Sequence, residues 1–252
     1  RKQESSGLLR ELNQWISSYK ETQRYLSVYA KYFKNSRSNL RVKSDYYSLS
    51  TGKISMWDEM IKRASTEIGW DWRLLASLMY QESGFDPDVE SWAGAYGLMQ
   101  VMPMTGERFG IDVKSSPANN MRAGILNIKW LTTMYASKIA DDEERFKFIL
   151  ASYNAGPGHI LDAMKLAEKN GMDPQKWEGN VAVWLLKKSD PVYYNDKVVK
   201  NGYFRGTESV TYVSEILERY DHYRNIISGE NVNRLTMNMG QDNRKSDALI
   251  AD

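Results

Sequence analysis

From residue 55 onward, the sequence is a series of short apolar stretches with helical spacing, most of them preceded by residues that commonly begin a helix. These residues are Ser55 with Asp58, Asp71, Ser116-Pro117, either Asp141 or Asp142, and Gly156-Pro157. They supply a side-chain acceptor for free backbone N–H groups or a proline in the first turn. Apolar residues then recur every three to four positions, as on one buried face of a helix. No segment shows convincing alternation of apolar and polar residues, so we predict a mainly α fold.

Polar segments divide the chain into three predicted parts. Residues 7–33 have helical periodicity, and a basic stretch with little periodicity follows them. We therefore predict an N-terminal helical extension and linker at 1–52 and a main domain at 53–228. Residues 229–252 are polar and lack an apolar face for packing, which predicts a flexible tail. Because the sequence begins at Arg1 without Met, we expect a processed or excised piece of a longer chain.

The composition excludes several chemistries. The 252 residues include no Cys and only two His, so a thiol nucleophile, a disulfide, a Cys-ligated zinc and a three-His metal site are all excluded. We predict no metal and no cofactor. The formal net charge of +2 argues against bulk capture of nucleic acid, so no nucleic-acid partner is expected. The 16 Tyr and 8 Trp combine apolar faces with polar edges, which suits sugar binding as well as ordinary packing.

Glu82 is the strongest catalytic candidate on chemical grounds. It falls near the end of a predicted helix whose preceding residues include Leu78 and Met79. Nearby apolar side chains and the negative end of a helix dipole both favour a protonated carboxyl, which a general acid needs at neutral pH. A solvated Glu at a helix end is the plainer interpretation. The segment that follows contains Gly94 and Gly97, whose backbone freedom suits a loop that approaches a ligand closely, so a cleft beside Glu82 is predicted.

Several motifs, in a fixed order, resemble a known family. They are Glu82-Ser83, Gly94-x-x-Gly97-Leu98-Met99-Gln100-x-x-Pro103-x-Thr105, Ala151-Ser152-Tyr153-Asn154-Ala155-Gly156 and Glu208-x-x-x-Tyr212-Val213. Together they resemble the family 1 lytic transglycosylases, whose catalytic domain is of the soluble, goose-lysozyme-like (SLT) type. The resemblance covers about residues 53 to 227. It implies a lysozyme-like, mainly α catalytic domain with an N-terminal helical extension, acting on the glycan strands of peptidoglycan.

Within this family the sequence is most similar to a membrane-bound branch. In that branch a periplasmic solute-binding-like domain precedes the catalytic domain. The resemblance then implies that residues 1–52 are the end of such a domain, or a connection to it. It also implies a periplasmic, cell-envelope location with peripheral outer-membrane association of the full-length protein. The absent upstream domain would act as a regulatory partner that controls access to Glu82.

The resemblance implies one catalytic residue and several that bind substrate. Glu82 matches the family's catalytic Glu. The remaining matches are Ser91 beside the reacting sugar's acetamido group, Gln100 at a substrate contact, Tyr153 and Asn154 on the cleft floor, and Tyr212 with its hydroxyl toward the sugar. The implied reaction needs one carboxyl. Glu82 would protonate the departing glycosidic oxygen, then take the proton of the C6 hydroxyl as that oxygen closes onto C1 to form a 1,6-anhydro-muramoyl sugar.

Other functions stay open at this point. A hydrolytic muramidase of the same fold would need a second carboxylate, for which Asp86, Asp88 and Glu90 are near in sequence. A peptidoglycan-binding module with an inactive site is a second alternative, and a helical interaction domain without a site is the third. The survival of Glu82 and its matched partners weighs against inactivity, and product analysis would separate these classes.

Two further features have simpler interpretations. Trp92 follows Ser91 where the family usually has a small residue, and it either adds a stacking surface or covers the loop, with cover favoured. The pair Lys187-Lys188, with Lys197 and Lys200, forms a modest basic patch that we interpret as a solvated face.

Overall fold

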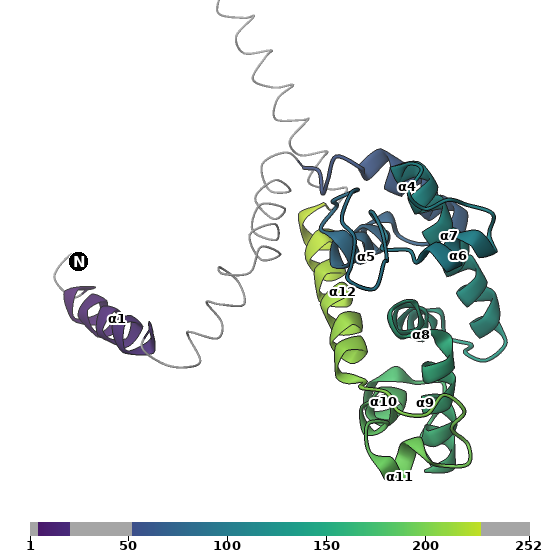
Figure 1. The fold of residues 1–252 in the computed structure, drawn as a ribbon. Coiled ribbons are helices and arrows are strands. Elements are labelled where there is room, and N and C mark those ends of the chain that lie inside the picture. Colours follow the sequence, from purple (N-terminus) through teal and green to yellow (C-terminus); the bar gives the residue numbers. More distant parts are fainter. Residues whose placement is uncertain (1–4, 21–51, 228–252) are drawn as a thin grey trace, which may run out of the picture. The chain divides into compact units, whose positions relative to one another are not determined.

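The computed structural model describes residues 5–20 and 52–227, and the chain divides between Thr51 and Gly52 into two units (Figure 1). In the first unit, helix α1 (Ser5–Lys20) exposes its apolar side chains, and Trp15 stacks on Tyr19 with ring centroids 5.2 Å apart. The rest of the predicted helix at 7–33, the linker after it and the predicted tail at 229–252 lie outside the described residues.

The second unit consists of helices joined by loops. In chain order they are α4 (Asp58–Ile68), α5 (Trp72–Ser83), α6 (Pro103–Arg108), α7 (Pro117–Ala136), α8 (Asp142–Ala155), α9 (Pro157–Lys169), the π-helical turn η2 (Trp177–Val181), α10 (Ala182–Lys187), α11 (Pro191–Tyr194) and α12 (Thr207–Ile226). Between residues 52 and 227 the only extended pairing is a pair of isolated bridges, Glu90 with Tyr96 and Tyr96 with Val101. The predicted mainly α fold is confirmed. None of the described helices is both long and apolar enough to cross a membrane.

The predicted cap residues begin the helices as expected. The Asp71 carboxylate accepts a hydrogen bond from the backbone N–H of Arg73, the Ser116 hydroxyl accepts from Asn119, and Asp141 accepts from two N–H groups of its own first turn. Helix α4 begins differently, because buried Asp58 lies inside its first turn and its carboxylate accepts backbone N–H groups from the residues before the helix. Side-chain acceptors therefore mark the beginnings of α5, α7 and α8.

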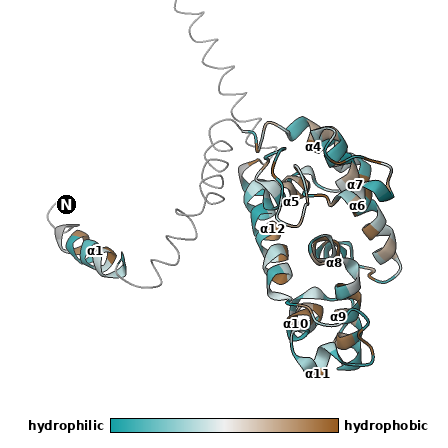
Figure 2. Ribbon diagram, viewed as in Figure 1, coloured by the Kyte–Doolittle hydropathy of each residue, from teal (hydrophilic) through white to brown (hydrophobic). Residues whose placement is uncertain are grey.

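Helices α5 and α8 form the centre of the hydrophobic core. Consecutive residues of each are buried, including Leu74 to Tyr80 in α5 and Phe148 to Ser152 in α8. Helices α4 and α12 pack against α5, while α7, α9 and α12 pack against α8. Figure 2 shows apolar segments on α8 and α10, whereas the outer helices α4 and α12 are largely hydrophilic. A helix buried on all sides loses the one-sided pattern of a surface helix, so α8 has little amphipathic character.

Helix α12 runs antiparallel to α5, and polar contacts tie one end of the pair. The Arg73 guanidinium forms an ion pair with Asp71 at 2.5 Å and donates to the carbonyl of Ile227 at 2.9 Å. The Tyr220 hydroxyl donates to the same Asp71 carboxylate at 3.2 Å. The start of α5 is thereby held beside the end of α12, which places the end of α5 beside the beginning of α12.

A buried ion pair organises the segment between α10 and α12. The Lys188 ammonium lies 2.7 Å from the Asp162 carboxylate, and their side chains are 0% and 1% exposed. Asp162 also accepts the backbone N–H groups of Lys200 and Asn201 at 2.9 and 2.8 Å. The interpretation of Lys188 as part of a solvated patch is therefore wrong, because this lysine turns inward to neutralise a carboxylate that the core encloses.

Candidate active site

The end of α5 brings Glu82 together with tyrosines from two other helices. The half-buried Glu82 accepts a hydrogen bond from the hydroxyl of Tyr212 on α12, and Tyr212 itself is 6% exposed. Tyr153 on α8 donates its hydroxyl to the carbonyl of Met99 at 2.8 Å, and the charge of Glu82 acts on its pKa. Residues far apart in the sequence thus lie beside one carboxyl.

Both tyrosines remain protonated over the whole neutral range. Burial, and then the negative charge of Glu82, raise the pKa of Tyr153 and the pKa of Tyr212 well above their ordinary value, and the hydrogen bond to Glu82 raises that of Tyr212 further. A protonated phenol donates a hydrogen bond, so Tyr212 holds the Glu82 carboxylate in one orientation. It also supplies a fixed dipole beside the carboxyl group.

The loop that follows Glu82 is fastened to the end of α5. Gly84 ends the helix in the left-handed conformation, with φ of 64°. The Ser83 hydroxyl donates to the carbonyl of Leu98 at 2.8 Å and accepts from the N–H of Phe85 at 3.1 Å. Ser83 therefore caps the helix locally and also joins both ends of the loop beside the catalytic candidate.

Gln100 and Ser91 lie in this loop and help to build it. Gln100 has φ of 45°, and its amide nitrogen donates to the carbonyls of Val89 and Gly97 at 2.9 and 3.0 Å. The Ser91 hydroxyl accepts the N–H of Ala95 at 2.9 Å. Both side chains thus stabilise the loop through hydrogen bonds to its backbone. The resemblance implies substrate contacts for them as well.

Asn154 is exposed and lies close to the beginning of α12. Its amide oxygen accepts a hydrogen bond at 2.6 Å from the hydroxyl of Ser209, which is 0% exposed. The neighbouring Ser152 is buried, and its hydroxyl pairs with that of Tyr135 at 2.6 Å. Asn154 therefore joins α8 to α12 at the level of the two tyrosines, while Ser152 faces the core.

Asn120 in α7 supports the loop through hydrogen bonds to its backbone. None of the sequence motifs includes this residue. Its oxygen accepts the N–H of Met99 at 2.9 Å, and its nitrogen donates to the carbonyls of Tyr96 and Val113 at 2.7 and 3.2 Å. Its side chain also packs so closely against Gly97 that an added Cβ there would lie 2.8 Å from it. The one signal in the sequence is that Asn120 occupies a position on the apolar face of its helix, where a polar side chain needs partners.

We expect Asn120→Ala to lower the free energy of unfolding by about 2–3 kcal/mol, because buried backbone groups at Met99, Tyr96 and Val113 lose their partner. Denaturant unfolding followed by circular dichroism measures this change. The neighbour Asn119 is the matched control, since it is exposed and its side chain bonds only at the helix start, to Ser115. Asn119→Ala should change stability by less than about 0.5 kcal/mol. Equal effects of the two substitutions would contradict the role of Asn120.

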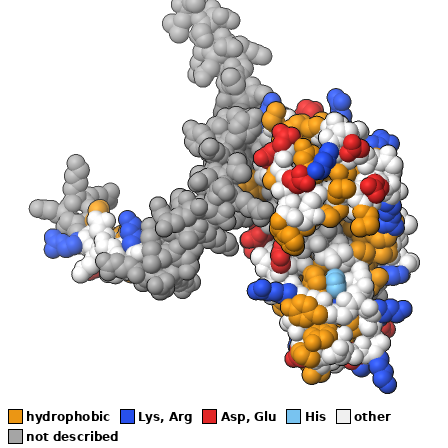
Figure 3. Space-filling view, in the orientation of Figure 1, with side chains coloured by type: hydrophobic (Ala, Val, Ile, Leu, Met, Phe, Trp, Pro, Cys, Tyr) orange, Lys and Arg blue, Asp and Glu red, His pale blue; other side chains and the backbone are white. Residues whose placement is uncertain are grey.

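The acids considered for a second carboxylate have other positions in the loop. Asp86 accepts the N–H of Asp88 at 2.9 Å. Asp88 lies 3.4 Å from the hydroxyl of Tyr96, and Glu90 forms an ion pair with Lys114 at 2.8 Å. All three acids are exposed, and each contacts a neighbouring group of the loop or Lys114. Acidic and basic side chains are also interspersed over the face seen in Figure 3, without an extended area of one sign.

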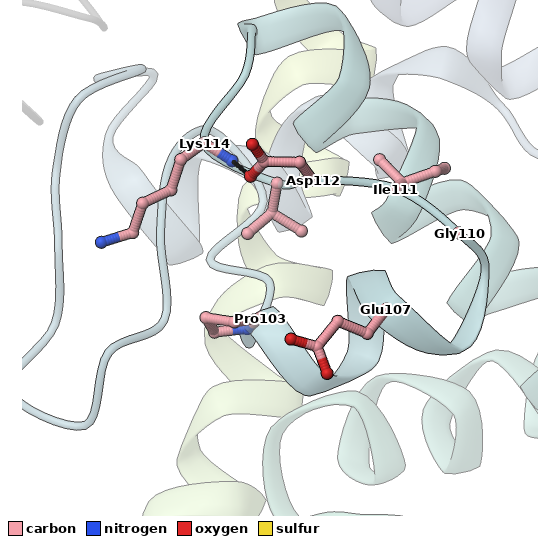
Figure 4. A pocket seen from close by; sticks show the side chains of 7 residues that line it. Pro103, Glu107, Gly110, Ile111, Asp112 and Lys114 are labelled. Atoms are coloured by element: carbon pink, nitrogen blue, oxygen red, sulfur yellow. Dashed lines mark hydrogen bonds between the residues drawn. The ribbon is translucent and has the colours of Figure 1, made fainter.

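A separate pocket of about 560 Å³ lies between α6 and the turn after it (Figure 4). It is lined by Pro103, Glu107, Gly110, Ile111, Asp112, Val113 and Lys114. Its lining includes none of the six predicted site residues, and the Lys114 side chain extends away from Glu107. Among residues 5–20 and 52–227, no three His, Asp or Glu side chains gather closely enough to hold a metal ion.

Comparison with known proteins gives the relatives of this chain. The transglycosylase SLT domain model matches residues 59–175. Membrane-bound lytic murein transglycosylase F from Desulfosudis oleivorans is 34% identical over 217 residues, which are 85% of this chain and 47% of the relative. The protein of the same name from Pasteurella multocida is 40% identical over 146 residues, which are 58% of this chain and 29% of the relative. The chain spans about half the length, or less, of these curated relatives.

Solved structures of lytic transglycosylases are also similar. The lytic transglycosylase Slt from Pseudomonas aeruginosa is 20% identical, with a TM-score of 0.45, over 75% of this chain and 30% of that chain. The 70 kDa soluble lytic transglycosylase from Escherichia coli is 21% identical, with a TM-score of 0.44, over 87% of this chain and 35% of that chain.

The domain match includes both α5, which carries Glu82, and α8, which carries Tyr153. The resemblance to the membrane-bound branch of the family is confirmed, since the relatives at 34% and 40% identity carry that name. The predicted lysozyme-like, SLT-type fold is likewise confirmed. Residues 59–175 therefore match a transglycosylase SLT domain, and the chain as a whole is similar to the membrane-bound lytic murein transglycosylases F.

Proposed function

We propose that this chain is the catalytic part of a peptidoglycan lytic transglycosylase. It would cleave the β-1,4 bond between N-acetylmuramic acid and N-acetylglucosamine and leave a 1,6-anhydro-muramic acid end. The observation that carries this proposal is the hydrogen bond from Tyr212 to Glu82 at the end of α5, within a chain that matches the transglycosylase SLT domain. A carboxyl that a protonated tyrosine orients suits a reaction in which one group serves first as acid and then as base.

Glu82 acts in both halves of the proposed reaction. In the first half, its carboxyl proton passes to the glycosidic oxygen as the bond to C1 breaks. The substrate's own N-acetyl oxygen stabilises the positive charge that develops at C1. In the second half, the Glu82 carboxylate takes the proton of the C6 hydroxyl while that oxygen bonds to C1. Glu82 ends protonated, as it began, and no water is consumed.

The other site residues orient the carboxyl and the sugar. Tyr212 fixes one oxygen of Glu82 through its hydrogen bond. Tyr153 has its hydroxyl bonded to the carbonyl of Met99, which places the ring of a cleft-floor residue against the loop. Ser91 and Gln100 would contact the substrate from this loop, and Asn154 from the end of α8. Residues held by several hydrogen bonds lose little freedom when substrate binds, which favours catalysis by positioning.

The cell envelope is the proposed place of action, because the curated relatives are named membrane-bound lytic murein transglycosylases. We also propose peripheral outer-membrane association of the full-length protein. A regulatory solute-binding-like domain would precede the catalytic domain at 53–228, with residues 1–52 as the connection or the end of that domain and 229–252 as a tail. The greater length of the relatives supports an additional domain.

The products of digestion test the proposal directly. We expect mass spectrometry of digested, purified peptidoglycan to show muropeptides that end in 1,6-anhydro-muramic acid. Products heavier by one water molecule, with free reducing ends, would instead identify a hydrolytic muramidase. Absence of any soluble product from a folded chain would favour a binding module. The three outcomes are mutually exclusive for the main product.

A further inference from the structure

We infer that Trp92 is a substrate-contacting residue that binds a sugar ring of the glycan strand away from the bond being cleaved. This inference rests on the proposed function and adds a binding position to it. Trp92 is 100% exposed, whereas Trp70, Trp177 and Trp184 are buried. The interpretation that Trp92 covers its loop is therefore wrong, because a side chain without burial covers nothing.

The exposure of Trp92 arises from a well-ordered turn. The backbone N–H of Ser91 donates to the carbonyl of Ala95 at 2.8 Å, and the N–H of Gly94 donates to the carbonyl of Ser91 at 2.9 Å. The Ser91 hydroxyl accepts the N–H of Ala95 as well. Gly94 has φ of 88°, a conformation that lets the turn reverse without strain. The indole is thus presented at the tip of a closed turn.

The loop that carries this turn is braced at its base and on its flank. Gly97 donates its N–H to the carbonyl of Val89 at 2.9 Å, which joins the two sides of the loop below the turn. On the flank, the Glu90 carboxylate pairs with Lys114, whose ammonium lies 5.2 Å from the centre of the Tyr96 ring. A side chain on such a support pays little ordering cost when a ligand binds.

The base of the same loop meets the catalytic carboxyl. Ser83, the residue after Glu82, is bonded to Leu98 at the returning end of the loop. Trp92, at the opposite end, is fully exposed and so is not packed against Glu82 or Tyr212. A polymer that passes Glu82 and continues along the loop would meet Trp92 at a sugar other than the two that share the reacting bond. Contact at this point would affect binding of long strands and leave the chemical step unchanged.

The chemistry around Trp92 favours a sugar over a lipid surface. An exposed indole offers a broad apolar face and a polar N–H, which match the C–H face and the hydroxyl groups of a sugar ring. The neighbouring Ser91, Ala93 and Gly94 are small and leave the indole accessible. Asp88 and Glu90 in the same loop are exposed acids, which oppose an anionic lipid surface. We therefore commit to the glycan strand as the ligand.

Binding in an inactive background tests this inference. Two variants of the complete 252-residue chain are compared, one with Glu82→Gln alone and one with Glu82→Gln and Trp92→Ala. Each is titrated by calorimetry with peptide-free glycan strands of increasing defined length. We expect Trp92→Ala to weaken the Kd for long strands about tenfold, equal to about 1.4 kcal/mol, and to change the Kd for the shortest bound fragment less than about twofold. Trp92→Phe should restore most of the affinity. In the active chain, KM for long strands should rise while kcat stays within about twofold.

Trp15 provides the matched control, since it is also an exposed tryptophan, at 62%, but lies in α1 of the other unit. Trp15→Ala should leave every Kd unchanged. Three results would overturn the inference. The Kd of Trp92→Ala for long strands could equal that of its parent, or Trp92→Phe and Trp92→Ala could weaken binding equally. The third is a Trp92→Ala substitution that raises the Kd for short and for long strands by the same factor. Trp92-dependent binding to anionic phospholipid vesicles in place of glycan would also overturn the inference. Normal Trp92-dependent glycan binding without anhydro products would instead contradict the proposed function alone.

Discussion

Glu82→Gln is expected to lower the turnover of purified peptidoglycan about 10³-fold or more, with little change in the fold or in glycan binding. Glutamine has the size of glutamate, and its oxygen can still accept the hydrogen bond from Tyr212. It cannot donate a carboxyl proton or take one from the C6 hydroxyl, so both halves of the proposed reaction fail. Release of soluble muropeptides measures turnover, and thermal unfolding checks that the variant is folded.

The exposed acids of the loop are the controls for this substitution. Asp86→Asn, Asp88→Asn and Glu90→Gln should each keep turnover within about threefold of the parent. Their contacts are with the backbone of Asp88, with Tyr96 and with Lys114. A hydrolase of this fold would need one of them as its second carboxylate, and the matching variant would then lose activity as severely as Glu82→Gln. Turnover within tenfold of the parent for Glu82→Gln itself would exclude the proposed mechanism.

Asp162→Ala is expected to produce the largest loss of stability, about 3–5 kcal/mol in the free energy of unfolding. The substitution leaves the Lys188 ammonium buried without its carboxylate, and it also removes the acceptor for Lys200 and Asn201. Denaturant unfolding measures the change. Glu67→Ala is the matched control, because Glu67 pairs with Lys129 at 3.2 Å on the surface, where both side chains are about half exposed. Its loss should cost less than about 1 kcal/mol.

The contribution of Asp162 to the free energy of unfolding also depends on pH. Burial raises the pKa of Asp162, but the hydrogen bonds from Lys188, Lys200 and Asn201 outweigh burial and hold the pKa below its ordinary value. A carboxyl with a lowered pKa stabilises the fold above its unfolded pKa of about 3.9, and this stabilisation is lost as the pH falls further. The difference in stability between the parent and Asp162→Ala should therefore shrink below about pH 4. A difference that grows in acid would contradict this assignment.

Local signals in the sequence predicted the helices well. Asp71, Ser116 and Asp141 cap helices where their side chains were expected to, because a cap depends on residues only two or three positions away. Residues whose environment depends on distant parts of the chain were harder to predict. Lys187 and Lys188 are adjacent in sequence, yet only Lys188 points at Asp162, and nothing within the local sequence distinguishes them.

The candidate site shows the same division. Helical spacing and helix-end electrostatics singled out Glu82, but Tyr212 entered through family resemblance, because the two residues are 130 positions apart. Asn120 carried no motif, since its role consists of hydrogen bonds to backbone groups that any sequence possesses. Trp92 was visible as an unusual neighbour of Ser91, but its full exposure is a property of the folded turn.

The antiparallel pairing of α5 and α12 has a consequence for when activity can arise. Among the helices described between residues 52 and 227, Glu82 lies on the second, and the tyrosine that orients it lies on the last. Contacts between residues so far apart form only after the entropy of closing the intervening loop has been overcome. A growing chain therefore carries its acid long before it carries the partner of that acid. A fragment that stops at residue 175, where the family match ends, would lack Tyr212 altogether. Under the proposed function, the pair formed by Glu82 and Tyr212 is complete only once the chain from α5 to α12 has been synthesised and has folded.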